Sequence, residues 1–284
     1  MPELPEVETI VRGLKEKIPG QQINRVKVNL DKVVKGDKKD FGLRLTGLAF
    51  QDVRRRGKMI VFHLSEGWSL VVHLKLTGQL IYTQPEAPVA KHTHIIFELE
   101  RGNQLRYLDL RQLGFLLLAR TDQVDNLPQL TELGTDALEI SSQDFGKLIS
   151  SKRGAIKSLL LNQSLLAGVG NLYSDEALHR AQIHPLQPAN TLTPSQIEKL
   201  YQAIRKILIK AIELKGSSVD NYVDSEGERG AYQAFHQVYD REGKSCFQCG
   251  QPVKRIKLGS RSTYFCPNCQ KLEVRGQKAE TSDF

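Results

Sequence analysis

The chain has 284 residues and a formal net charge of +8, and its 40% hydrophobic content is sufficient for a globular protein of about two domains. No apolar run approaches the roughly 18 residues that cross a bilayer. The acidic start MPELPEVE also lacks the apolar segment of a secretory signal. We therefore expect no membrane partner and a cytoplasmic location, and the positive balance favours a polyanionic partner.

The first predicted element is a helix over residues 5–17, in which apolar residues recur every three or four positions. Pro2 and Pro5, with the nearby glutamates, are typical of a helix start. From residue 21 to residue 120 short β-rich runs alternate with turn signals, and no helix-length pattern intervenes. This pattern predicts antiparallel strands in a sandwich or barrel, which with the helix form an α+β N-terminal domain over 1–130.

The sequence changes character after this domain. Residues 131–140 are predicted to be a linker, and helical spacing of apolar residues returns over 141–235. The motifs SSQD and TPSQ are predicted helix starts, because serine or threonine precedes the first turn. Residues 216–232 are interpreted as a flexible loop. A cysteine-containing segment occupies 236–270, and the polar residues 271–284 are expected to be disordered.

Four cysteines form two C-x2-C pairs separated by sixteen residues, a strong signature of a zinc site. The predicted ligands are Cys246, Cys249, Cys266 and Cys269. One zinc ion is expected, and it is structural because protein thiolates fill all four positions. The surrounding segment 244–271 carries six cations and no acidic residue. We favour a phosphate backbone as the partner of this charge over a solvated basic face.

The segment LLAGVGNLYSDEALHRA (165–181) predicts two helices joined by a tight glycine turn, with Asn171 capping the second helix. The backbone N–H groups of such a turn and of the following helix bind anions, and phosphate is the obvious candidate. The turn alone is weak evidence, since any helical hairpin can use one. Three upstream cations are in reach of neighbouring phosphates: Lys152, Arg153 and Lys157.

Seven motifs occur along the chain in one order. They are PELPEVE at 2–8, RRRGK at 54–58, HLKLTG at 73–78, KHTH at 91–94, DLRQLG at 109–114, GVGNLY at 168–173 and SRSTYFCPNCQ at 260–270. Together they resemble the formamidopyrimidine-DNA glycosylase family, also called 8-oxoguanine DNA glycosylases, from residue 2 to residue 270. The resemblance implies an N-terminal catalytic domain with a β-sandwich, then a helix-two-turn-helix domain that binds DNA and a zinc ribbon over 236–270.

The resemblance also implies a bifunctional enzyme. Such an enzyme excises oxidised purines, 8-oxoguanine and formamidopyrimidines, from duplex DNA and then cleaves the strand by β,δ-elimination. If Met1 is removed, Pro2 becomes a secondary amine with an ordinary pKa of about 8. The free base attacks the sugar C1′, and the resulting iminium acidifies the C2′ proton. Glu3 then exchanges protons with the sugar or base, and Glu6 orients the amine.

Further roles are carried over by resemblance alone. Lys58 contacts damaged DNA and donates protons, and Arg261 reaches the phosphates of the damaged nucleotide and assists δ-elimination. His92 contacts DNA near the lesion. Arg111 does the same, and it also fills the space beside the cytosine left alone when the damaged base flips out. His73 is expected to be structural.

At two positions the chain departs from the family pattern. Leu76 and Leu113 stand where the family usually has a methionine and a phenylalanine beside the arginine. Leucine still inserts as an apolar wedge. Because it lacks a flat ring to stack on bases, we expect weaker lesion interrogation or an altered preference for the opposite base. Two alternatives remain open: an endonuclease VIII-like enzyme for oxidised pyrimidines, and a non-catalytic zinc-ribbon DNA-binding protein. The protein is expected to act as a monomer on double-stranded DNA containing oxidised bases or abasic sites.

Overall fold

The computed structural model describes residues 1–274 and 277–278. Contacts divide the chain into two compact units, Met1–Glu132 with Ala211–Gln233 and Leu133–Lys210 with Ala234–Phe284. The expected helical domain ran through residue 235, but residues 211–233 contact the N-terminal unit instead. For example, the backbone N–H of Tyr82 donates to the Ser225 carbonyl at 2.8 Å.

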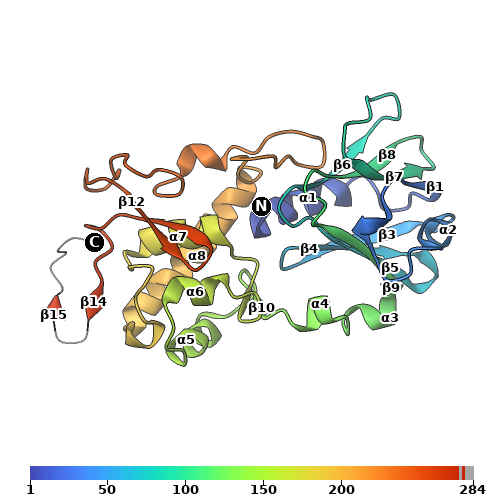
Figure 1. The fold of residues 1–284 in the computed structure, drawn as a ribbon. Coiled ribbons are helices and arrows are strands. Elements are labelled where there is room, and N and C mark those ends of the chain that lie inside the picture. Colours follow the sequence, from blue (N-terminus) through green and yellow to red (C-terminus); the bar gives the residue numbers. More distant parts are fainter. Residues whose placement is uncertain (275–276, 279–284) are drawn as a thin grey trace. The chain divides into compact units, whose positions relative to one another are not determined.

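The first unit contains helix α1 (Leu4–Lys15), two sheets and short helical turns (Figure 1). The four-stranded sheet has the order β1 (Ile23–Val28), β7 (Thr93–Leu99), β8 (Gln104–Asp109) and β6 (Gly78–Thr83). The five-stranded sheet has the order β2 (Val34–Lys35), β9 (Phe115–Arg120), β5 (Trp68–His73), β4 (Met59–Leu64) and β3 (Phe50–Arg56). The short helices are η1 (Asp31–Val33), α2 (Phe41–Leu45), η2 (Ser65–Gly67), α3 (Thr121–Val124) and α4 (Pro128–Thr131).

One hydrophobic core joins α1 to both sheets. Ile10 of α1, Phe62 of β4 and Phe97 of β7 are fully buried members of the same cluster. Because each sheet contributes one face to this core, the unit is a β-sandwich with a covering helix, and that prediction is confirmed. The strand pairs are antiparallel except β2–β9, which is parallel.

The second unit begins with helices, as the sequence predicted. They are α5 (Ser142–Ser150), α6 (Ile156–Leu161), α7 (Asn171–Ala181) and most of α8 (Pro194–Glu213). The unit also contains η3 (Ala189–Thr191), the end of η4 (Tyr232–Phe235) and the parallel pair β10 (Thr135–Asp136) and β11 (Leu166–Ala167). Ser141 caps α5 by accepting the Asp144 N–H, so the SSQD helix start is confirmed. Thr193 and Gln196 exchange hydrogen bonds of the capping-box type at the start of α8.

The cysteine segment forms an antiparallel ribbon of β12 (Lys254–Leu258) and β13 (Arg261–Phe265). It is followed by a two-residue pairing of β14 (Glu273–Val274) with β15 (Gln277–Lys278). The rest of the predicted disordered tail, 275–276 and 279–284, lies outside the described residues. None of the helices in the described part of the chain is both long and apolar enough to cross a membrane.

A buried polar network docks the ribbon on α6 and α7. The Lys157 ammonium lies 2.7 Å from an Asp175 carboxylate oxygen, and both side chains are fully buried. Lys157 also donates to the Thr263 hydroxyl at 2.7 Å, and Asp175 accepts the Tyr264 N–H at 3.0 Å. Burial raises the pKa of Asp175 to about 7, against the opposing effect of Lys157. A buried ion pair of this kind is tolerated because each charge is also hydrogen-bonded.

We expect Lys157→Met to lower the free energy of unfolding by about 3–5 kcal/mol, because it leaves the Asp175 carboxylate buried without its cation. Adding Asp175→Leu should recover most of that loss. Thermal unfolding together with the zinc content of the purified protein measures both effects. Lys147→Met is the matched control, since its pair with Asp144 is exposed and worth little. An equal loss in the control, or no recovery in the double variant, contradicts the prediction.

Candidate active site and nucleic-acid interface

The start of the chain is held rigidly at the N-terminus of α1. Pro2 is buried, and Glu3 and Glu6 are 4% and 3% exposed. Glu3 is the N-cap residue and forms a capping box with Glu6, whose Oε2 accepts the Glu3 N–H at 2.8 Å. The residue that follows Pro2 is therefore fixed by two reciprocal hydrogen bonds. The predicted helix start and the predicted catalytic pair occupy the same turn.

The second carboxylate oxygen of Glu6 holds the loop over residues 216–232. Glu6 Oε1 accepts the Ser217 N–H at 2.8 Å. Gly216 has a φ of +80°, and a Cβ there would lie 2.9 Å from the same oxygen, so only glycine permits this approach. Tyr222 is buried, and its hydroxyl donates to the Glu6 carbonyl at 3.4 Å. The loop predicted to be flexible is thus anchored to the start of the chain.

Lys58 lies in the two-residue turn between β3 and β4, directly after Gly57, and is 8% exposed. Arg55 fixes this turn: it donates to the Gly57 carbonyl at 3.0 Å and to Glu8 Oε2 at 2.8 Å. Burial opposes ionisation of Glu8, but the hydrogen bonds and charges of Arg12 and Arg55 outweigh it and lower the pKa of Glu8. The turn that carries Lys58 is therefore tied to the helix that begins beside Pro2.

Three turns of the sandwich carry the residues expected to contact DNA beside the lesion. Arg111 is exposed, Leu113 is 47% exposed, and Leu76 and His92 are partly exposed. Leu110, which the sequence analysis did not single out, is 54% exposed next to Arg111. The 109–114 turn therefore presents a cation between two apolar side chains.

His73 is structural, as expected. Its Nδ1 accepts the Lys75 N–H at 3.0 Å. Burial, assisted by the Lys75 charge, lowers the pKa of His73 to about 3, so the ring is neutral near pH 7 and can act as this acceptor.

The helix hairpin differs from its prediction at two residues. Gly170 is the N-cap of α7, and Asn171 is the first helical residue, so the predicted Asn171 cap is wrong. The Asn171 amide donates to the Ser262 carbonyl at 2.9 Å instead, while its Oδ1 is buried without a partner among the described residues. Lys157 is fully buried in its pair with Asp175, so the predicted contact between Lys157 and a phosphate is also wrong. Lys152 is partly exposed, which leaves it accessible for such a contact.

Arg261 begins β13 at the ribbon turn and is exposed. It has no hydrogen-bond or ion-pair partner in the part of the chain that the structure describes. The neighbouring Ser262 and Thr263 are fixed by Asn171 and Lys157, so the buried network holds the backbone beneath this free guanidinium. Tyr264 packs on Tyr239, with ring centroids 5.3 Å apart.

The four cysteines form a site of the right size for zinc. Their Sγ atoms all lie within 4.8 Å of one another, and two of the separations are 3.9 and 3.4 Å. A tetrahedral ion with Zn–S bonds of about 2.3 Å needs sulfurs about 3.8 Å apart, so the residues fit one structural zinc. His179, which the sequence analysis missed, lies in α7 with its Nε2 3.5 Å from Cys246 Sγ.

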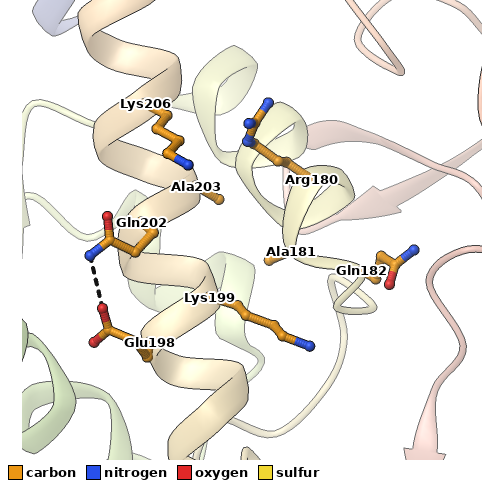
Figure 2. Close-up of a pocket in the computed structure, with 8 residues that line it drawn as sticks. All are labelled: Arg180, Ala181, Gln182, Glu198, Lys199, Gln202, Ala203 and Lys206. Atoms are coloured by element: carbon orange, nitrogen blue, oxygen red, sulfur yellow. Dashed lines mark hydrogen bonds between the residues drawn. The ribbon is translucent and has the colours of Figure 1, made fainter.

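A groove of about 340 Å³ lies between the end of α7 and one face of α8 (Figure 2). It is lined by the cations Arg180, Lys199 and Lys206, none of which has a partner among the described residues. Glu198 is occupied by hydrogen bonds from Ser142 and Gln202. The groove is therefore electropositive and adds to the attraction of this unit for a polyanion. No local motif indicates it, because its cations come from two helices.

Three domain families with known members match most of the chain. The formamidopyrimidine-DNA glycosylase N-terminal domain matches residues 1–116, and the H2TH domain of the same enzymes matches 133–223. A zinc finger found in FPG and IleRS matches 243–272.

Individual relatives are similar in sequence to this chain over their full length. The formamidopyrimidine-DNA glycosylase of Pelotomaculum thermopropionicum is 47% identical, over 96% of this chain and 100% of the relative. That of Streptococcus pneumoniae is 39% identical with the same coverage.

Solved structures agree as well. Lactococcus lactis Fpg bound to DNA with an abasic site superposes with a TM-score of 0.88 at 36% identity, covering 95% of this chain and 99% of that one. A structure of MutM with DNA that contains carbocyclic 8-oxo-G gives the same values. The chain belongs to the formamidopyrimidine-DNA glycosylase family.

Proposed function

We propose that this protein is a bifunctional DNA repair enzyme that excises oxidised purines from duplex DNA and cleaves the strand at the resulting abasic site. The full-length relatives are named for the glycosylase activity, and related structures hold DNA with Fapy-dG, 8-oxo-G or an abasic site. The observation in this chain that carries the proposal is the fixed start of α1, where the Glu3–Glu6 capping box holds the backbone directly after Pro2.

The chemistry follows from this arrangement once Met1 is removed. The Pro2 nitrogen attacks the sugar C1′, and the C1′–N bond to the base breaks as the base takes up a proton. The sugar ring then opens: the C1′–O4′ bond breaks, O4′ takes up a proton, and the nitrogen and C1′ are left as an iminium. The positive charge of the iminium makes the C2′ proton acidic. Loss of that proton expels the 3′ phosphate, which is the β-elimination step. Glu3, the residue next to the amine, is the group we assign to these proton transfers.

Two cations complete the proposed catalytic set. Lys58 is nearly buried in a turn fixed to α1, which suits a proton donor to the sugar or base. Arg261 is exposed and has no partner among the residues that the structure describes, which suits a ligand for the phosphates of the damaged nucleotide. By neutralising the second phosphate as it leaves, Arg261 assists δ-elimination. Asn171 and Lys152 are assigned to the DNA backbone on the helical unit.

Selectivity is assigned to the exposed turns of the sandwich. Arg111 hydrogen-bonds the base left unpaired when the lesion flips out, and cytosine presents acceptors that suit a guanidinium. Leu76 and Leu113 insert beside it as apolar wedges, and His92 contacts the backbone near the lesion. Apolar leucines fill this space without the stacking surface of an aromatic ring.

The protein is further proposed to act as a monomer in the cytoplasm. A site of four thiolates favours a reducing compartment, where free cysteines persist. Light scattering of the protein with and without duplex DNA tests the monomer, and a dimer contradicts it.

On duplexes with a single lesion, we expect excision of 8-oxoguanine opposite cytosine to be at least about tenfold faster than excision of thymine glycol. Single-turnover rates measured on both duplexes test this ranking. The reverse ranking supports the endonuclease VIII-like alternative, and binding without any excision supports a non-catalytic protein.

Borohydride should trap a covalent complex with abasic DNA through residue 2, because the free secondary amine at that position forms an iminium that borohydride reduces. Peptide mass measurement after digestion identifies the attached residue. A preparation that retains Met1 with an acetyl cap should give no adduct, whereas Pro5→Ala, which alters the same helical turn but keeps the amine, should be trapped normally. An adduct on Lys58, or equal cleavage by the capped protein, contradicts the assignment.

Replacing Arg261 with alanine should slow δ-elimination about tenfold or more while β-elimination continues, because the second phosphate loses its counter-cation. The two products differ in their 3′ ends and separate on a denaturing gel. Arg255→Ala is the control: it removes an exposed ribbon arginine that already pairs with Glu242 at 2.7 Å. An unchanged product ratio in Arg261→Ala, or the same change in both variants, rejects the proposed role.

A further inference from the structure

One buried carboxylate connects the turns that carry Arg111, Leu113 and Leu76. Asp109, at the end of β8, is 1% exposed. Its Oδ1 accepts the Thr77 hydroxyl at 2.5 Å and the Arg111 N–H at 3.2 Å. Its Oδ2 accepts the Gly114 N–H at 2.8 Å and the Tyr107 hydroxyl at 3.3 Å. Both oxygens therefore accept two hydrogen bonds each, and together they join the 74–78 turn to the 109–114 turn.

The backbone of Asp109 extends the connection to the third turn. Its N–H donates to the His92 carbonyl at 3.1 Å, and its carbonyl accepts the His94 Nε2 at 2.8 Å. His92, Arg111 and the two wedge leucines thus stand on turns that meet at a single residue. The contacts that link the three turns are not local in the sequence, whereas those from Tyr107 and from within the 109–114 turn are.

The three connected turns are also strained. Each contains a non-glycine residue in the left-handed region: Lys75 at φ +52°, His92 at φ +69° and Gln112 at φ +52°. This conformation is unfavourable for residues other than glycine and persists only where surrounding contacts hold it. The contact between the Gly114 N–H and Asp109 requires a glycine, because a Cβ there would lie 2.1 Å from the Tyr107 hydroxyl and 2.6 Å from the His73 carbonyl.

We propose that Asp109 is the positioning residue for discrimination of the base opposite the lesion. It holds Arg111 and its neighbouring wedge leucines in one arrangement before DNA binds. This inference rests on the proposed function, which places Arg111 beside the unpaired base. Asp109 itself does not touch the reacting atoms.

The carboxylate is specifically required because all four of its partners are donors. Burial and the adjacent Asp109 charge raise the pKa of Tyr107, so its hydroxyl stays protonated and donates. An asparagine has one oxygen, so one pair of donors would face the NH₂ group of the amide. A buried donor without an acceptor is unfavourable, and the turn must shift to relieve it. Because two turns share the carboxylate, one substitution displaces both Arg111 and the turn of Leu76.

The test is Asp109→Asn, measured as the ratio of excision rates for 8-oxoguanine opposite cytosine and opposite adenine. We expect the ratio to fall about tenfold, the scale set by an unsatisfied buried donor. Cleavage of single-stranded DNA with an abasic site should stay within about twofold, since that substrate has no opposite base. Arg111→Ala should reduce the ratio similarly, and the double variant should lose little more than either single one.

Controls separate positioning from general damage to the fold. Asp52→Asn makes the same chemical change at an exposed strand residue paired with Lys15, and it should leave both assays unchanged. Thr77→Val removes one donor to Asp109 and should lower the ratio less than Asp109→Asn does. Thr77→Ser keeps the hydroxyl and should preserve the ratio. These two variants still test the inference if Asp109→Asn does not fold. An equal loss on all substrates, or an unchanged ratio beside a reduced ratio in Arg111→Ala, overturns the inference. An unchanged ratio in Arg111→Ala overturns the proposed role of Arg111 and the inference with it.

Discussion

The carboxylate of Glu6 is the constraint on which the candidate active site depends. It is buried, and its two oxygens accept the backbone N–H groups of Glu3 and Ser217. A buried carboxylate is tolerated only when it is hydrogen-bonded, so the start of the chain and the 216–232 loop are fixed by the same group. This contact also explains why residues 211–233 associate with the first unit, although helix α8 enters from the second. Residues at a chain end ordinarily fray, but Pro2, the nucleophile we propose, directly precedes the N-cap of a helix.

Buried acids have the same function in the second unit. Asp175 and Glu176 are adjacent on α7 and fully buried. Asp175 accepts the N–H of Tyr264 in the ribbon. Glu176 accepts the N–H groups of residues 237–239, which precede the ribbon in the chain. His179, one turn further along, contacts Cys246. Helix α7 therefore holds both β13 and the segment that leads to the first pair of cysteines. The four cysteines that fit one zinc lie at the end of the ribbon opposite the Arg261 turn. Arg261 is exposed, but the backbone that carries it is rigid.

The sequence predicted those features that depend on local spacing. The capped starts of α5 and α8, the sandwich strands and the four zinc ligands all follow from residues within a few positions of one another or from a known spacing. The features it missed depend on distant partners. Nothing in the segment around Lys157 indicates that Asp175 will bury it, and Asn171 donates to Ser262 rather than capping its helix because the ribbon packs there. Asp109 was quoted within a motif, but its role becomes visible only when Thr77 and His92 converge on it.

The turn over 109–114 shows why such a network would be useful if this turn contacts DNA as we propose. Leu110 and Leu113 expose about half of their side chains to solvent, with Arg111 between them. Insertion of exposed apolar side chains into a base stack is favourable, because it removes apolar surface from water. Ordering a mobile loop would offset part of this favourable free energy, so the benefit is largest when the turn is already ordered. A buried carboxylate with four donors provides this order in the absence of DNA. The free energy stored as backbone strain in the three turns is thus offset inside the protein, and the energy of insertion remains available for opening the duplex at the lesion.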